Sequence, residues 1–147
     1  MSTDHEHHDF EVDKLILKLK IRLAADQDAI DPAVQNIMQI VRKMDCAAGK
    51  EYDIELALVE ALANAVVHGA KSDRSKNIEC DVACDESRGM LIVVRDPGEG
   101  FDPAAIPSPV IGENVYSSHG RGIFLINQLM DDVKFHRNGT EIRMIKR

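Results

Sequence analysis

Glu60, Asn64 and His68 stand four residues apart in the segment VEALANAVVHG, which spans Val59–Gly69. In a helix, this spacing places the three side chains on one side, one turn apart. The Glu60 carboxylate can accept a proton from a hydroxyl group or from water. The amide oxygen of Asn64 can ligate Mg²⁺, which takes few protein ligands and completes its shell with water and phosphate oxygens. The alternative is a surface Glu beside a helix-edge Asn, with His68 only finishing the helix.

A second polar cluster, RDPGEGFD, covers residues 95–102 and directly follows an apolar segment typical of a central strand. Asp96 leaves the strand end, and Gly98 and Gly100 follow at alternate positions. Glycines here allow the backbone to approach a flat ligand, because no Cβ stands in the way. The Asp96 carboxylate can accept a hydrogen bond from an exocyclic amine such as N6 of adenine. The alternative is a tight turn that needs glycine.

A third cluster, SSHGRGI, covers Ser117–Ile123, where a long loop is expected to become a helix. Backbone N–H groups at a helix N-terminus bind phosphate, and the helix dipole favours the negative charge. Arg121 or His119 can add charge-assisted contacts. Gly120 and Gly122 flank Arg121, and taken alone this Gly-Arg-Gly arrangement is also common in helix caps that bind nothing.

Two helices are expected before the second cluster. Asp31-Pro32 opens the first helix, with Asp as the N-cap and Pro at the first helical position. The second helix ends at Gly69, and its apolar stripe leaves Glu60 and Asn64 at the stripe edge, facing a crevice. The expected stripes are Val34, Ile37, Met38, Val41 and Met44 in the first helix, and Leu56, Val59, Ala63, Val66 and Val67 in the second.

Alternating or continuous apolar runs predict five strands around these helices. The order β-α-α-β-β-loop-α-β-β predicts an α+β fold, a two-layer sandwich whose mixed, largely antiparallel sheet carries its helices on one face. The expected domain covers residues 10–147, after a disordered tail over residues 1–9. The expected elements are strands at Lys14–Leu23, Ile78–Cys84, Met90–Arg95, Val133–His136 and Glu141–Ile145, a loop at Gly100–Gly122 and a helix at Ile123–Met130.

Composition excludes several functions. The net charge of −7 gives no general basic footprint, so neither nucleic acid nor a membrane surface is an expected partner. No apolar run approaches the ~20 residues of a membrane span. The three cysteines lack metal-type spacing, and Cys80 and Cys84 share one face of a strand, where they are expected to be small core residues in a reducing cytoplasm.

Taken together and in this order, the motifs resemble those of the GHKL superfamily, the Bergerat-fold or histidine-kinase-like ATPases. Within it, the chain is similar to the anti-sigma factor serine/threonine kinases of bacterial partner-switching systems. The segments that carry the resemblance are VEALANAVVHG, VRDPGEGFDP, GRGIFLINQLMDDV and NGTEIRMIKR, so it covers essentially the whole chain.

The resemblance implies ATP and Mg²⁺ as the nucleotide and the metal, and a role for each matching residue. Glu60 is implied to be the general base and Asn64 the Mg²⁺ ligand. Asp96 is implied to read adenine, helped by Gly98 and Thr140. The remaining nucleotide-lining residues are implied to be Gly100, Gly120, Arg121 and Gly122, with Asp102–His119 as the lid.

The resemblance also implies partners. A protein of this type holds a sigma factor inactive, or binds a STAS-domain anti-anti-sigma protein and phosphorylates it on serine, and it forms a homodimer. Two alternatives stay open: a nucleotide-binding regulatory module without kinase activity, and a detached histidine-kinase catalytic domain that needs a phosphoacceptor histidine on a partner.

Overall fold

The computed structural model describes residues 15–85, 87–100 and 118–147. The tail expected over residues 1–9 and the lid residues Asp102–Ser117 lie outside the described residues. The described strands form a five-stranded sheet, and each of its strand pairings is antiparallel. The strands, in the spatial order of the sheet, are β1 (Leu15–Ala24), β2 (Asn77–Asp85), β3 (Gly89–Arg95), β5 (Glu141–Lys146) and β4 (Asp132–His136).

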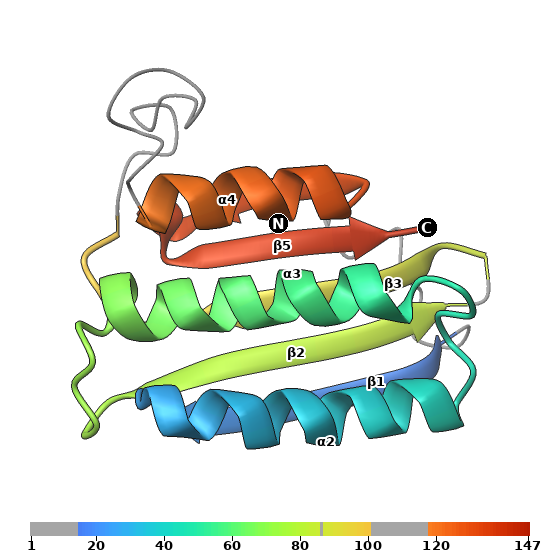
Figure 1. Ribbon diagram of the computed structural model, residues 1–147, viewed down its shortest axis with the longest axis horizontal. Coiled ribbons are helices and arrows are strands. Elements are labelled where there is room, and N and C mark those ends of the chain that lie inside the picture. The colour runs from blue at the N-terminus through green and yellow to red at the C-terminus, as the bar shows by residue number, and fades with distance from the viewer. Residues whose placement is uncertain (1–14, 86, 101–117) are drawn as a thin grey trace.

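Three α-helices of the described chain cover one face of this sheet (Figure 1). They are α2 (Ile30–Lys43), α3 (Glu51–Asn64) and α4 (Ser118–Leu129). The middle helix, α3, packs against α2 on one side and α4 on the other. This arrangement confirms the predicted α+β two-layer sandwich and the predicted order of its elements.

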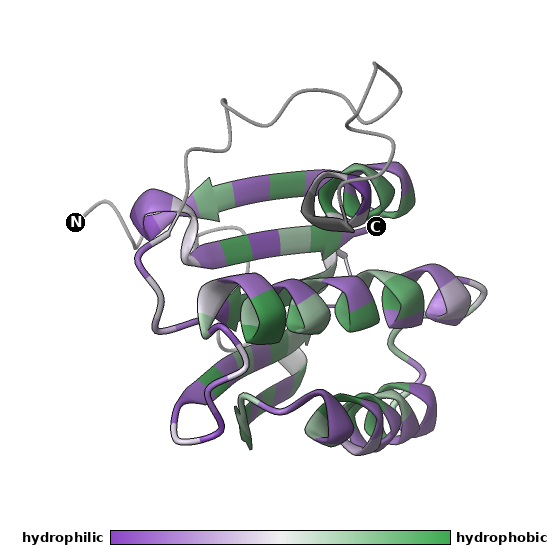
Figure 2. Ribbon diagram, turned by 60° about the vertical axis from the view of Figure 1, so that its left-hand side comes forward, coloured by the Kyte–Doolittle hydropathy of each residue, from purple (hydrophilic) through white to green (hydrophobic). Residues whose placement is uncertain are grey.

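The core lies between the helices and the sheet, because side chains alternate between the two faces of each strand. Figure 2 shows this alternation of hydrophilic and hydrophobic residues along the strands. The expected core positions Cys80 and Cys84 are buried there. The largest fully buried apolar side chains include Ile37, Met38, Ile54, Leu58, Leu62, Ile78, Ile92, Ile126 and Met144. No helix in the described part of the chain has both the length and the apolar character needed to cross a membrane.

The predicted stripe of the first helix is largely correct. Val34, Ile37, Met38 and Val41 are buried, whereas Met44, just beyond the helix end, is 41% exposed. The predicted start of this helix is wrong: the N-cap is Ala29 rather than Asp31, and the helix begins at Ile30 rather than at Pro32, because a 3-10 turn (η2, Gln27–Ala29) precedes it. Asp26 caps that turn, and its side chain accepts a hydrogen bond from the backbone N–H of Asp28.

The predicted stripe of the second helix is wrong at most positions. Leu56, Val59, Ala63 and Val67 are only partly buried. Because α3 has a neighbouring helix on each side, apolar residues occur around most of its circumference and periodicity did not fix its inner face. The fully buried set is instead Ile54, Ala57, Leu58, Ala61, Leu62, Ala65 and Val66.

Candidate functional site

The polar residues of α3 lie at its C-terminal end, where the helix changes its winding. Residues Ala65–Gly69 continue α3 as a π-helical turn (η3). Such turns are rare and occur frequently at functional sites, because the extra residue per turn shifts the side chains that follow. The turn contains His68 and ends at Gly69, the predicted end of the helix.

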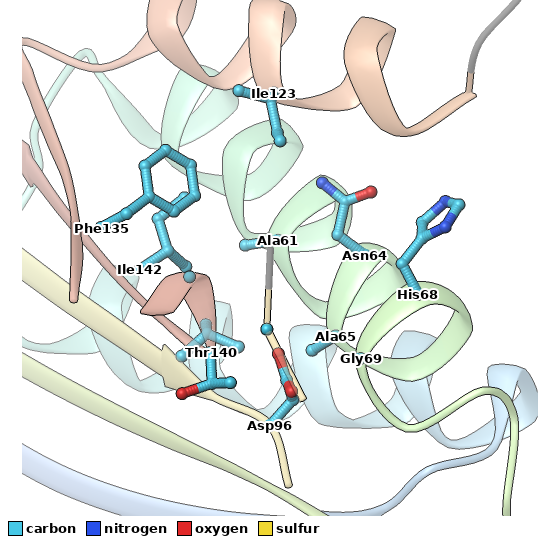
Figure 3. A pocket seen from close by; sticks show the side chains of 13 residues that line it. Ala61, Asn64, Ala65, His68, Gly69, Asp96, Ile123, Phe135, Thr140 and Ile142 are labelled. Carbon is cyan, nitrogen blue, oxygen red and sulfur yellow. The ribbon is translucent and has the colours of Figure 1, made fainter. Parts of the chain in front are cut away.

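A cavity of about 230 Å³ opens beside this turn, between α3, α4 and the sheet (Figure 3). In Figure 3, Phe135 and Ile142 lie on one side of the cavity, Asn64 and His68 on the other, and Asp96 below. Apolar walls around one carboxylate suit a flat, amine-bearing ring. The lining residues are Ala61, Asn64, Ala65, His68, Gly69, Val94, Asp96, Gly100, Ile123, Phe135, Gly139, Thr140 and Ile142.

Asp96 follows β3 directly, and its position is fixed from several directions. Its backbone N–H donates to the carbonyl oxygen of Thr140 over 2.9 Å, so β3 and β5 remain joined at this point. Its Oδ1 accepts a hydrogen bond of 2.8 Å from the backbone N–H of Gly98. Burial raises the pKa of Asp96 above its ordinary value, although the Gly98 hydrogen bond opposes this shift. A half-buried carboxylate with free acceptor capacity therefore faces the cavity.

Two glycines make this arrangement possible. A Cβ on Gly69 would overlap the Asp96 carboxylate, and a Cβ on Gly98 would overlap the carbonyl oxygen of Gly69. The end of the π-helical turn therefore packs directly against the segment that carries Asp96. From the sequence, Gly69 is expected only to end the helix, because this contact joins segments that are distant along the chain.

Glu60 and Asn64 meet α4 at Gly122. A Cβ on Gly122 would lie 3.1 Å from Glu60 Oε2 and 3.2 Å from Asn64 Oδ1. The polar ends of both side chains thus converge on one point of α4, where a Cβ would make an unusually tight contact. Asn64 lines the cavity and Glu60 does not, so Glu60 lies just beyond the cavity on the same helix.

The turn between β4 and β5 closes the cavity from the sheet side. Arg137, Asn138 and Gly139 form a 3-10 turn (η6) in which each residue has a positive φ. The hydroxyl group of Thr140 donates to the carbonyl oxygen of Arg137 over 2.7 Å. A Cβ on Gly100, whose φ is 88°, would overlap the carbonyl oxygen of Asn138. The cavity-lining residues Gly100 and Thr140 are therefore held together by this turn.

His68 was left open by the sequence, and the structure places it on the cavity wall beside Asn64. Burial, and then the nearby charge of Lys71, lower the pKa of His68 below its ordinary value. The neutral imidazole, which can both donate and accept a hydrogen bond, is therefore favoured at this wall.

The third predicted cluster differs from expectation. The helix α4 begins at Ser118 rather than at Ile123, so Gly120, Arg121 and Gly122 lie within its first turns instead of in a loop. Gly120 and Gly122 are buried, whereas Arg121 is exposed and does not line the cavity. Glycine has a low intrinsic helix propensity, so the packing of α4 against α3 outweighs it here.

The apolar walls of the cavity were not predicted from sequence patterns. Ile123, Phe135 and Ile142 come from three different elements and carry no motif of their own. For Phe135 and Ile142 the available signal was their alternation with polar residues along β4 and β5, which indicates a shared face of the sheet but not a cavity. Ile123 lies on α4 and had no such signal.

Comparison with known proteins agrees with this geometry. Residues 23–146 match the family described as histidine kinase-like ATPase domain. The chain is 37% identical over 114 residues to a serine-protein kinase RsbW of Staphylococcus epidermidis, covering 67% of this chain and 69% of that protein. It is 27% identical over 135 residues to a serine-protein kinase RsbW of Oceanobacillus iheyensis, covering 87% of this chain and 85% of that protein. The match includes strands β2 to β5, the three helices and every residue that lines the cavity, and the chain belongs to the histidine kinase-like ATPase family.

Proposed function

We propose that the protein is an ATP-dependent protein serine/threonine kinase that acts as an anti-sigma factor in the cytoplasm. It would bind a sigma factor, and it would phosphorylate a STAS-domain anti-anti-sigma protein on serine. The observation that carries this proposal is the meeting of Asn64 and Asp96 on one cavity, with Glu60 one helical turn from Asn64. The similarity to proteins named as serine-protein kinases supports the choice of reaction.

The adenine base would occupy the cavity. Its apolar walls exclude water from a flat ring, and the Asp96 carboxylate would accept a hydrogen bond from the exocyclic amine. Gly98 and Thr140 would hold Asp96 in place through the hydrogen bonds described above. The phosphates would extend toward α4, where Gly120, Arg121 and Gly122 are the proposed contacts, and Gly100, beside Asn138, would be a further contact.

The residues present fit a magnesium ion. Oxygen atoms of Asn64 and Glu60 converge beside Gly122, and Mg²⁺ prefers oxygen ligands together with water and phosphate oxygens. Asn64 would hold the ion, which when bound neutralises charge on the transferring phosphoryl group. No group of three or more His, Cys, Asp or Glu side chains in the described residues is arranged to hold a metal by itself.

Glu60 would act as the general base. It would accept the proton of the serine hydroxyl while the serine oxygen forms a bond to the γ-phosphorus. The bond between that phosphorus and the β–γ bridging oxygen would break, and ADP would leave. Addition of a phosphate to the bound serine places new negative charge at the contact surface, which would release the partner.

Phosphotransfer from γ-labelled ATP tests this proposal. The protein, ATP and Mg²⁺ would be mixed with the STAS-domain proteins of the same organism, with Asp96→Asn as the variant expected to lose nucleotide binding. We expect acid-stable label on a serine of one STAS protein, absent with Asp96→Asn. Retained ATP binding without any label would instead favour a regulatory module, and acid-labile label on a histidine would favour a detached histidine-kinase catalytic domain.

A further inference from the structure

A row of alternating charges crosses the sheet face opposite the helices. Arg22 of β1, Glu79 of β2, Arg95 of β3 and Glu141 of β5 are successive partners in the strand register. Their neighbours along the strands, such as Ile78, belong to the core on the helix side. Because side chains alternate between the faces of a strand, the four charged residues lie on the other face.

The two ends of this row differ in burial. The side chains of Arg22 and Glu79 are 67% and 48% exposed, and their ion pair spans 3.2 Å. Exposed ion pairs of this kind contribute little to the stability of the fold. The Glu141 side chain is only 2% exposed, and its Oε1 accepts a hydrogen bond of 2.7 Å from Arg95 Nε. The strong part of the row therefore lies between β3 and β5.

Arg95 is the centre of a partly buried network rather than one member of a simple pair. Its Nη1 also donates to Asp81 Oδ2 over 2.8 Å, and Glu141 Oε2 accepts a second hydrogen bond of 2.9 Å from Arg143 Nε. Burial opposes ionisation of Glu141, but the hydrogen bonds from Arg143 and Arg95 prevail and hold its pKa below the ordinary value. Charge-assisted hydrogen bonds of this geometry fix the relative position of their partners.

This network lies directly behind the base site. Arg95 and Glu141 are partners in the strand register. The next pair toward the cavity is Asp96, which follows Arg95, and Thr140, which precedes Glu141. The backbone N–H of Asp96 donates to the carbonyl oxygen of Thr140. Any shift of β3 against β5 at Arg95 would therefore move the Asp96 carboxylate relative to the cavity.

We propose that Arg95 and Glu141 are positioning residues for base recognition, which fix the Asp96 carboxylate from the opposite face of the sheet. This inference rests on the proposed function, because it takes Asp96 as the acceptor of the adenine amine. It goes further by assigning the accuracy of base recognition to an ion network that does not line the cavity.

The discriminating measurement is the ratio of two affinities, for ATP and for the triphosphate of purine riboside, which lacks the 6-amino group. A hydrogen bond from the amine to a carboxylate should favour ATP roughly 10- to 100-fold in the wild type. A purely structural role of the network would lower both affinities together and leave their ratio unchanged.

Arg95→Met is the principal variant. It removes the hydrogen bonds to Asp81 and Glu141, keeps a long apolar side chain, and leaves Glu141 paired with Arg143. We expect this variant to lose most of the preference for ATP, so that its affinities for ATP and for the purine riboside triphosphate differ by no more than about threefold. Arg22→Met, at the exposed end of the same row, is the matched control and should keep the wild-type ratio.

The outcomes separate this inference from the proposed function. A wild type that binds ATP no better than the analogue contradicts both. If the wild type prefers ATP, two results overturn only the positioning role. One is a folded Arg95→Met variant whose ratio of affinities is unchanged. The other is an Arg22→Met variant that loses as much of the preference for ATP as Arg95→Met does. If Arg95→Met does not fold, Arg95→Lys decides the question: its single amine cannot hold both carboxylates, so the ratio should fall, and an unchanged ratio overturns the inference.

Discussion

The helices α2 and α3 lie side by side on the same face of the sheet, yet only α3 carries cavity residues (Figure 1). α2 buries one stripe against the core and turns charged residues such as Arg42 and Lys43 outward. α3 has helices on both sides, and its polar residues occur where its C-terminal end reaches the cavity. α2 therefore contributes to the core alone, whereas α3 contributes both to the core and to the cavity wall.

The largest expected effect on ATP binding comes from the end of α3. Gly69→Ala would place a methyl group on the Asp96 carboxylate, so we expect ATP affinity to fall by roughly 100-fold or more, the equivalent of losing a charge-assisted hydrogen bond. Calorimetric titration with ATP measures this loss. Gly49→Ala, just before the other end of the same helix, is the control: a Cβ there meets nothing within 4 Å, so only the positive φ is strained and ATP binding should persist.

The second effect concerns two carboxylates of the same helix. We expect Glu60→Ala to retain ATP binding and to lose phosphotransfer by about 10²- to 10⁴-fold, the usual contribution of a general base. Glu55→Ala is the matched control, because Glu55 pairs with Arg42 of α2 and does not line the cavity. Single-turnover phosphotransfer measures the rate of both variants. A Glu60→Ala variant as fast as the wild type would contradict the role of Glu60 as the general base.

The third effect tests whether α2 is only structural. Ile37 is fully buried in α2, so Ile37→Ala should lower the free energy of unfolding by about 2–5 kcal/mol. Denaturant unfolding measures that loss. The folded fraction should bind ATP with wild-type affinity, and a weaker intrinsic affinity would mean that α2 also shapes the cavity.

The smallest effect is a dependence on pH. Because burial raises the pKa of Asp96, its carboxylate is protonated at a higher pH than an ordinary aspartate. As the pH falls through that raised value, the preference for ATP over the purine riboside analogue should decline. The contribution of Asp96 to the free energy of unfolding should rise over the same fall in pH, since protonation removes a buried charge from the folded state.

Asp96→Asn separates the effect of Asp96 on stability from the effects of other groups. Because this variant is expected to lose nucleotide binding, denaturant unfolding is its readout, and the contribution of Asp96 to the pH dependence of unfolding should be absent. If the preference of the wild type declines only at the pH of an ordinary aspartate, the half-buried carboxylate is not the group that reads the base.

Much of this architecture could be predicted because its signals are local. The stripe of α2 and the alternation of β2 each depend on residues within a single element. The polar positions Asn64, Asp96, Gly100 and Thr140 were also identified from spacing and resemblance, and they line one cavity. Their individual roles remain predictions.

The remaining features depend on contacts between distant segments. The inner face of α3 is set by its two neighbouring helices, and the early start of α4 by packing that outweighs two glycines. The importance of Gly69 arises from Asp96, and that of Arg95 from Glu141 on a non-consecutive strand. Local sequence patterns carry no information about such pairs.

The strand order has a consequence for folding. β2–β3 and β4–β5 each join neighbours in the described order of strands, whereas the β3–β5 pairing joins Arg95 to Glu141 across 46 residues. Closing so long a segment costs more chain entropy than closing a hairpin. A nucleotide held between Asp96 and Thr140 would touch both hairpins and bind only after they have met. A bound nucleotide would then shift the folding equilibrium toward the folded state by mass action.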